Sequence, residues 1–275
     1  MAAVVRVFDG DHLRAELVRR GGATLCVTFD YRRLDRAGFG PLSPSRQIAA
    51  AGHDQLMIAT RGNDWFINPD TPALEAVCRP LRASYGAARA LGFSMGGYGA
   101  FRFSRTLNLG HVVAVSPQVS IAPDMVPFDR RYRQEGRLFD SALGDLTALH
   151  DPALQGAILC DSLNLLDLTH ARMLQVLFPA LRLIRLPGGG HPCTQVLRAI
   201  SRTGLIQRLA LGEAAAAGAL QQAHRQARGQ SAGYWTALGR AAAARRPDLA
   251  AAAGWRAANL AAADTGRVDE DGDSA

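Results

Sequence analysis

Apolar and polar residues alternate along the first part of the chain in runs that predict strands. The runs 3–8 and 13–18 flank a tight Asp-Gly-Asp turn, and the second run alternates apolar with polar positions, as a half-exposed antiparallel strand does. The runs 24–29 and 55–60 are almost continuously apolar, which is typical of central strands buried on both faces of a sheet. Residues 43–51, between them, have the length and the glycine stop of a short helix.

Further runs with strand character follow, at 89–93, 111–115, 157–160 and 181–186. Helical or irregular segments separate them, so the alternation of strand and helix continues. Strands arranged in this way pair in parallel through right-handed crossovers, and helices cover both faces of the sheet. We therefore predict an α/β fold with a mostly parallel sheet of about eight strands, flanked by helices.

The last part of the chain has a different pattern, in which alanine-rich helices replace the alternation. Helices are predicted over 212–228, 231–245 and 247–263. We expect residues 1–205 to form the main domain. Residues 206–264 form an α-helical extension that packs on this domain or contacts a protein partner or a second copy of the chain. The acidic segment 265–275 is predicted to be a disordered tail.

The net charge of +7 comes entirely from arginine, because the chain contains no lysine. A pI of about 9.9 is compatible with binding to nucleic acid. The arginines are scattered, however, no nucleic-acid motif is present, and only 7% of the residues are aromatic. We therefore expect no nucleic-acid partner.

The sequence contains no run of about 18 apolar residues, and its first residues lack the basic-then-apolar pattern of a signal peptide. We expect no membrane span. The cysteines, Cys26, Cys78, Cys160 and Cys193, include no closely spaced pair of the kind that binds a metal or forms a redox motif. A reducing, cytoplasmic location is the expectation that follows.

Ser94 is the strongest candidate for chemistry. It lies in Gly92-Phe93-Ser94-Met95-Gly96, between a run with strand character and a glycine-rich segment able to start a helix. A nucleophilic serine in such a strand-to-helix turn needs small neighbours, which Gly92 and Gly96 supply. The turn exposes the hydroxyl. The helix N-terminus directs backbone N–H groups, that of Met95 first, toward the space beside it, where they form an oxyanion hole.

His191 is the candidate base for this serine. It follows the last strand run in a glycine loop, Gly188 to Gly190, a position from which an imidazole reaches back to take the proton of Ser94. Asp161 directly follows the preceding strand run. The chain order serine, aspartate, histidine is the order in which α/β-hydrolases carry their triad.

With these residues, the segment 1–205 resembles the α/β-hydrolase superfamily and its serine-esterase branch. The longer string 92–100 is also similar to the hydrolase-like domain of accessory secretion proteins. The resemblance implies an α/β-hydrolase fold with a serine nucleophile, followed here by a C-terminal helical extension. It also implies that 116–155, which is too long for a plain connection, is a lid-like insertion.

The acid of the triad departs from the family's pattern. Hydrolases of this fold place it about three residues beyond the end of the penultimate strand, which here corresponds to the uncharged Asn164. Asp161 and Asp167 lie on either side. We favour Asp161, because the end of a strand is rigid. Asp167 remains the alternative, although it would also serve to cap a helix that begins near Thr169.

Three further residues are candidates by position. Tyr31, after the third strand run, is the candidate second oxyanion-hole donor beside Met95, although the family's usual His-Gly pair is absent there. Trp65 lies in a loop on the same rim, and it either contacts the substrate or is buried in the core. Arg131, in the basic part of the insertion, either binds an anionic substrate group or belongs to a solvated surface.

Together these residues predict a serine hydrolase that cleaves a small-molecule carboxylic ester or thioester through an acyl-enzyme. Transfer of the acyl group to an alcohol uses the same residues, so an acyltransferase remains open. The competing hypothesis is a hydrolase-like fold that serves as a non-catalytic binding or scaffold module, which the displaced acid and the appended helices favour. Neither a metal ion nor an organic cofactor is implied.

Overall fold

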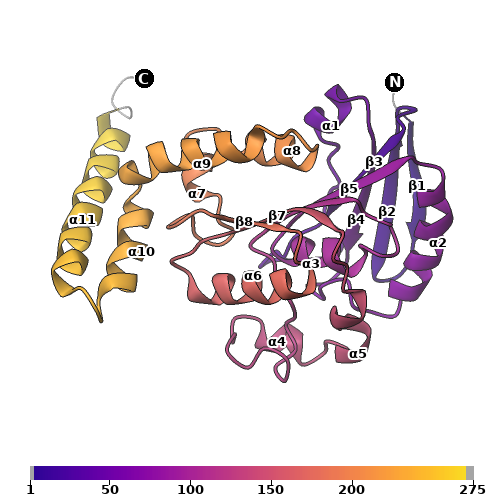
Figure 1. Ribbon diagram of the computed structural model, residues 1–275, viewed down its shortest axis with the longest axis horizontal. Coiled ribbons are helices and arrows are strands. Elements are labelled where there is room, and N and C mark those ends of the chain that lie inside the picture. Colours follow the sequence, from indigo (N-terminus) through magenta and orange to yellow (C-terminus); the bar gives the residue numbers. More distant parts are fainter. Residues whose placement is uncertain (1–2, 271–275) are drawn as a thin grey trace.

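The computed structural model describes residues 3–270, and these residues form one eight-stranded sheet flanked by helices (Figure 1). The strands are β1 (Ala3–Asp9), β2 (Leu13–Arg19), β3 (Thr24–Phe29), β4 (Asp54–Thr60), β5 (Ala87–Phe93), β6 (His111–Val115), β7 (Gln155–Cys160) and β8 (Arg182–Arg185). Their order is β1-β2-β4-β3-β5-β6-β7-β8. β2 pairs antiparallel with β1 and β4, whereas the pairs from β4 through β8 are parallel. The mostly parallel sheet predicted from the sequence is confirmed.

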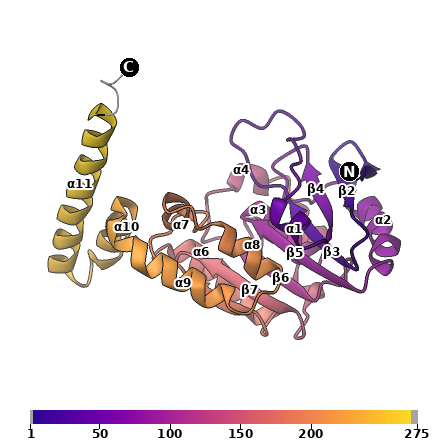
Figure 2. The ribbon, with the colours of Figure 1, turned by 90° about the horizontal axis from the view of Figure 1, so that it is seen from above.

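Helices cover both faces of this sheet (Figures 1 and 2). The helices are α1 (Arg46–Ala50), α2 (Thr71–Ala83), α3 (Met95–Arg102), α4 (Arg133–Gly136), α5 (Ser141–Gly144), α6 (Leu165–Leu177), α7 (Gln195–Ala199), α8 (Gly204–Ala210), α9 (Ala216–Ala227), α10 (Ala232–Ala242) and α11 (Pro247–Glu270), with the short 3₁₀ helices η1 (Thr147–Leu149) and η2 (Arg228–Gln230). α2, α3 and α6 share one hydrophobic core with the sheet, and α7, α8 and α9 share the other.

The central strand β6 contributes side chains to both hydrophobic cores. Val112 and Ala114 belong to the core under α2, α3 and α6, whereas Val113 and Val115 belong to the core under α8 and α9. Successive side chains of a strand point to opposite faces of the sheet, so a strand covered by helices on both sides is apolar throughout. This arrangement explains why the central runs of the sequence are continuous rather than alternating.

The C-terminal helices divide between the main body and a separate hairpin. Ala217 and Leu220 of α9 belong to the same core as β6, so the main body extends beyond the boundary predicted at residue 205. α10 and α11 pack against each other as a hairpin at one end of the molecule (Figure 1). α11 continues to Glu270. The first residues of the predicted disordered tail, 265–275, are therefore helical, while 271–275 lie outside the described residues.

This architecture is the α/β-hydrolase fold that the sequence predicted. The carboxyl ends of parallel strands meet at one edge of such a sheet, and ligand sites form there. Ser94 follows β5, Asp161 follows β7, and the loop that carries His191 follows β8, so the candidate residues gather at this edge. Within the described residues 3–270, no helix is long and apolar enough to cross a membrane.

Candidate active site

Ser94 occupies a strained turn between β5 and α3. Its backbone has φ 50° and ψ −116°. Residues other than glycine rarely adopt this conformation, so the surrounding structure must enforce it. A Cβ atom on Gly92 would lie 2.0 Å from the carbonyl oxygen of Gly96, and one on Gly96 would lie 2.6 Å from that of Asp30. Both positions therefore require glycine, and the two glycines allow the turn that presents the Ser94 hydroxyl at the edge of the sheet.

His191 contacts both Ser94 and an aspartate. Its Nε2 atom lies 2.9 Å from Ser94 Oγ, and its Nδ1 atom lies 2.7 Å from Asp167 Oδ2. The Asp167 carboxylate accepts a hydrogen bond from a protonated Nδ1, and this tautomer leaves Nε2 unprotonated and able to accept the hydrogen bond of the serine hydroxyl. Ser94, His191 and Asp167 thus form one chain of hydrogen bonds.

Asp167 is held in the first turn of α6. The side chain of Asn164 caps this helix by accepting hydrogen bonds from the N–H groups of Leu166 and Asp167, so the position at which the family's pattern places the acid serves as a helix cap. The Asp167 side chain is 1% exposed. Burial would raise the pKa of its carboxyl, but the hydrogen bond from His191 and the charges of His191 and Arg131 outweigh burial and hold the pKa below its ordinary value.

Asp161 has a different role from the one we favoured. Its Oδ1 atom accepts hydrogen bonds from the N–H groups of Leu163 and Gly188, both at 2.8 Å, and its Oδ2 atom accepts one from Gly190 at 3.0 Å. These contacts fix the glycine loop that leads to His191. The preference for Asp161 as the partner of His191 is therefore corrected to Asp167.

The two candidate oxyanion-hole donors differ in their surroundings. Met95 is the first residue of α3, where a backbone N–H group has no acceptor within the helix. The N–H group of Tyr31, by contrast, donates to the carboxylate of Asp30 at 2.8 Å. The Tyr31 residue is 53% exposed and lines the cavity beside Ser94. The geometry supports Met95 as a donor and leaves Tyr31 as a wall of the cavity.

Trp65 lies beneath the site rather than on its rim. The residue is fully buried, and its Nε1–H group donates to Oε1 of Gln118 at 3.0 Å. Its ring packs on that of Tyr132, with 4.8 Å between the ring centroids. Of the two readings left open by the sequence, the structure supports burial in the core, and direct contact of Trp65 with a substrate is corrected.

Arg131 contacts carboxylates of the protein. Its Nη1 atom lies 2.7 Å from Asp167 Oδ1, and its Nη2 atom lies 2.7 Å from Asp129 Oδ2. Nδ1 of the buried His170 accepts a hydrogen bond from the N–H group of Val119, so the ring proton is on Nε2. Nε2 donates this proton in a hydrogen bond to Asp129 at 3.0 Å. The guanidinium of Arg131 thus pairs with two carboxylates of the protein, one of which contacts His191, and binding of an anionic substrate by Arg131 stays a prediction.

Tyr132 is a site residue that we did not assign from the sequence. Its hydroxyl lies 3.1 Å from Nε2 of His191, the same atom that Ser94 contacts. It belongs to the insertion between β6 and β7, next to Arg131 in the chain. Its position between arginines of the predicted lid-like insertion could have marked Tyr132 as a candidate site residue. The strand and helix patterns gave no indication of this role, because the segment around Tyr132 is irregular.

A cavity of about 680 Å³ opens beside Ser94. Its walls come from the loops after β3, β5 and β8, from the insertion, and from the segment that leads into α8. The lining residues are Tyr31, Arg32, Phe93, Ser94, Tyr132, His191, Pro192, Thr194, Arg198, Thr203 and Gln207. This volume is within the range of small-molecule sites.

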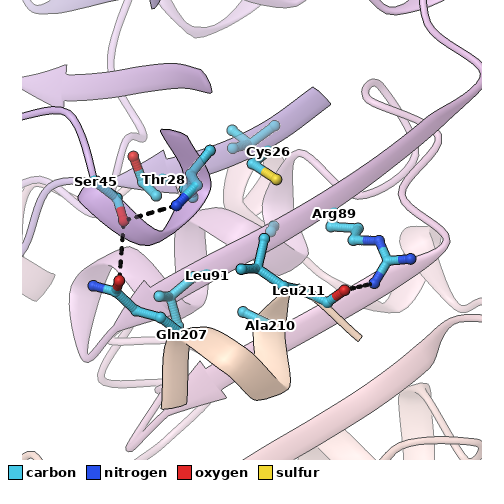
Figure 3. Close-up of a pocket in the computed structure, with 11 residues that line it drawn as sticks. Cys26, Thr28, Ser45, Arg89, Leu91, Gln207, Ala210 and Leu211 are labelled. Carbon is cyan, nitrogen blue, oxygen red and sulfur yellow. Dashed lines mark hydrogen bonds between the residues drawn. The ribbon is translucent and has the colours of Figure 1, made fainter. Parts of the chain in front are cut away.

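A second, smaller cavity lies between β3, β5 and α8 (Figure 3). Its volume is about 30 Å³, and Cys26, Leu91 and Ala210 contribute apolar walls. Gln207 lines both cavities and therefore lies between them. The hydroxyl of Ser45 holds this side chain by donating to its Oε1 atom at 3.0 Å (Figure 3).

Metal ligands do not gather anywhere in the described part of the chain: no three His, Cys, Asp or Glu side chains there form a group able to hold a metal ion. The four cysteines are buried and free. Cys193, two residues from His191, is fully buried, and burial raises the pKa of its thiol well above the ordinary value. A thiol in this state is not a reactive nucleophile.

Comparisons with known proteins find distant structural likeness. No protein-family model and no curated protein sequence matches the chain. The capsule O-acetyltransferase of Neisseria meningitidis serogroup A aligns over 73% of this chain and 93% of its own, with 16% identity and a TM-score of 0.48. A fungal esterase from Rhizomucor miehei aligns over 76% of this chain and 82% of its own, with 13% identity and a TM-score of 0.48. An esterase from Pyrococcus furiosus aligns over 75% and 91%, with 15% identity and a TM-score of 0.43.

Proposed function

We propose that this protein is a serine hydrolase that cleaves a carboxylic ester or thioester through a covalent acyl-enzyme. The observation that carries the proposal is the hydrogen-bond chain from Ser94 Oγ through His191 to the buried carboxylate of Asp167. A serine hydroxyl becomes a nucleophile when a base takes its proton during attack, and a carboxylate on the far nitrogen orients that base and stabilises its charged form.

Acylation follows from the contacts of Ser94. As Oγ bonds to the carbonyl carbon, its proton passes to Nε2 of His191, and the negative charge develops on the carbonyl oxygen. The N–H group of Met95, at the start of α3, donates to that oxygen. When the intermediate collapses, the bond to the leaving group breaks and Nε2 returns the proton to the leaving oxygen or sulfur. The acyl group then remains on Ser94.

Deacylation repeats these steps with water or an alcohol as the nucleophile that takes the acyl group from Ser94. Water yields the free acid, and an alcohol yields a new ester with the same residues, so acyl transfer is the second form of this proposal. The cavity of about 680 Å³ beside Ser94 provides room for either acceptor. The non-catalytic scaffold predicted as the competing hypothesis rested on a displaced acid and on the appended helices, and the contact of Asp167 with His191 speaks against the first of these reasons.

Two broader expectations stay predictions. A reducing, cytoplasmic setting agrees with four free cysteines, all of them buried. Contact with a protein partner or with a second copy through the C-terminal helices would involve the α10–α11 hairpin, where the Trp255 residue is 68% exposed.

The test is direct detection of the acyl-enzyme. The protein is mixed with nitrophenyl acetate, quenched in acid and measured by intact-mass spectrometry, with and without an added alcohol. We expect one acetyl group, mapped by proteolysis to Ser94 and absent from the Ser94→Ala variant. Acetate or acetyl ester as the product separates hydrolysis from transfer. A folded wild-type protein that neither acquires the acetyl group nor consumes the ester would refute the proposal.

A further inference from the structure

The hydroxyl of Tyr132 lies at the atom through which the proposed base exchanges protons. Nε2 of His191 is 2.9 Å from Ser94 Oγ and 3.1 Å from the Tyr132 hydroxyl. In the tautomer that donates from Nδ1 to Asp167, Nε2 has a single acceptor site. The serine and tyrosine hydroxyls therefore share the space within hydrogen-bond reach of that nitrogen.

The ring of Tyr132 is held firmly in this place. The Tyr132 residue is 7% exposed, and its ring packs on the buried ring of Trp65. The guanidinium groups of Arg131 and Arg32 lie 5.3 and 5.6 Å from its centroid. Arg131 is itself paired with two carboxylates, and Arg32 is paired with Glu135 at 2.7 Å. The hydroxyl is thus positioned before a substrate arrives, which is the condition for an effective catalytic donor.

The protonation state of Tyr132 suits a donor. Burial raises the pKa of the phenol, and the nearby charge of Arg131 opposes this effect only in part. The hydroxyl consequently keeps its proton at neutral pH and donates a hydrogen bond to an electronegative atom beside Nε2.

We propose that Tyr132 is a further catalytic residue, whose hydroxyl donates a hydrogen bond to the leaving-group oxygen during acylation. This oxygen must come within reach of Nε2 to receive the proton of His191, so it arrives beside the Tyr132 hydroxyl. As the carbon–oxygen bond breaks, the electron pair stays on the leaving oxygen and the Nε2 proton passes to it. Tyr132 keeps its own proton and stabilises the charge that builds up before the transfer is complete. The inference rests on the function proposed above.

The experiment compares leaving groups in the Tyr132→Phe variant. Values of kcat/KM, which report acylation, are measured for a nitrophenyl ester and an ethyl ester of the same acid. Nitrophenolate is a stable anion that leaves with little help, whereas an alkoxide needs stabilisation. A hydrogen bond to a developing charge contributes about ten- to a hundredfold in rate. We therefore expect a loss of that size for the ethyl ester and a loss below about threefold for the nitrophenyl ester.

Tyr98→Phe is the matched control. It also removes one buried tyrosine hydroxyl, which donates to the carbonyl oxygen of Gly144 at 2.7 Å, away from Ser94 and His191. This variant should keep the wild-type ratio of the two kcat/KM values even if it is less stable. Equal losses for both esters in Tyr132→Phe, or a gain for either ester, would overturn the role of Tyr132. Continued acylation of Ser94 in that variant would show that the proposed function itself stands.

Discussion

The Nδ1 atom of His191 lies 2.7 Å from Oδ2 of Asp167, a residue in the first turn of α6 rather than at the end of a strand. The proposed acid thus comes from a helix, and Arg131, in the insertion between β6 and β7, contacts it. Asp161, at the end of β7, holds the backbone of the loop that carries His191. One aspartate contacts the proposed base directly, and the other fixes the loop to which that histidine belongs.

Exchanging each aspartate for asparagine separates these roles. Asp167→Asn replaces an acceptor at Nδ1 with an amide and favours the wrong tautomer of His191, so kcat should fall by about 10³–10⁴-fold. Asp161→Asn weakens the hydrogen bonds to the glycine loop and should cost about 1–3 kcal/mol of stability, with a loss in kcat below about tenfold. Ester hydrolysis and urea unfolding measure both. A larger loss of kcat in Asp161→Asn than in Asp167→Asn would contradict the assignment of the acid.

Arg131→Lys tests whether this arginine positions the acid or binds substrate. A lysine contacts one carboxylate at a time, so the link between Asp129 and Asp167 is lost. We expect kcat to fall by about tenfold, with KM nearly unchanged for neutral and for anionic esters. Steady-state kinetics measure kcat and KM of both proteins for two esters that differ only in the presence of a carboxylate. A selective rise in KM for the anionic ester would instead indicate direct binding of the substrate by Arg131.

Acid should destabilise the protein through Asp129 and Asp167. Hydrogen bonds and positive neighbours outweigh burial and hold both pKa values below the ordinary 3.8. Each carboxylate therefore contributes stability above the unfolded pKa, and this contribution is lost as the pH falls through the folded pKa. Between about pH 5 and about pH 3, the free energy of unfolding should fall less steeply in Asp129→Asn than in the wild type, by up to about 1.4 kcal/mol per pH unit. Urea unfolding at several pH values measures this, and equal slopes would contradict the ion-pair network.

Gly92→Ala tests the close packing behind Ser94. The added Cβ atom would lie 2.0 Å from the carbonyl oxygen of Gly96, so the turn must shift and stability should fall by about 1–3 kcal/mol or more. Gly218→Ala in α9 is the control, because nothing lies within 4 Å of its added Cβ atom. That variant should gain about 0.5–1 kcal/mol from helix propensity. Thermal unfolding of both variants distinguishes them, and a neutral Gly92→Ala would contradict the geometry of the turn.

The fold and the serine turn were predictable because their signals are local. Apolar runs identify strands wherever helices cover both faces of the sheet, and Gly92 and Gly96 mark the turn within five residues of sequence. The glycine loop before His191 is equally visible. Local signals of this kind depend on backbone conformation and burial, which neighbouring residues largely determine.

The remaining parts of the site depend on contacts between distant segments. Asp161 and Asp167 are both close to the end of β7, and only the path of the glycine loop decides which of them meets His191. Arg131 and Tyr132 belong to an irregular insertion, whose course no periodic pattern specifies. Trp65 follows β4 in a position suited to a ligand contact, yet the insertion covers it. Tertiary packing determines which of these residues reach the site, and sequence spacing does not reveal it.

Covalent labelling with a fluorophosphonate probe tests the activated serine most directly. The probe reacts with a serine that a base activates, and the wild-type protein is compared with the Ser94→Ala and His191→Ala variants at matched concentration. Circular dichroism establishes that each variant is folded. We predict a single adduct on Ser94 in the wild type, and none in either variant. A folded wild-type protein that stays unlabelled, or that is labelled equally after loss of Ser94, would contradict the proposed serine hydrolase.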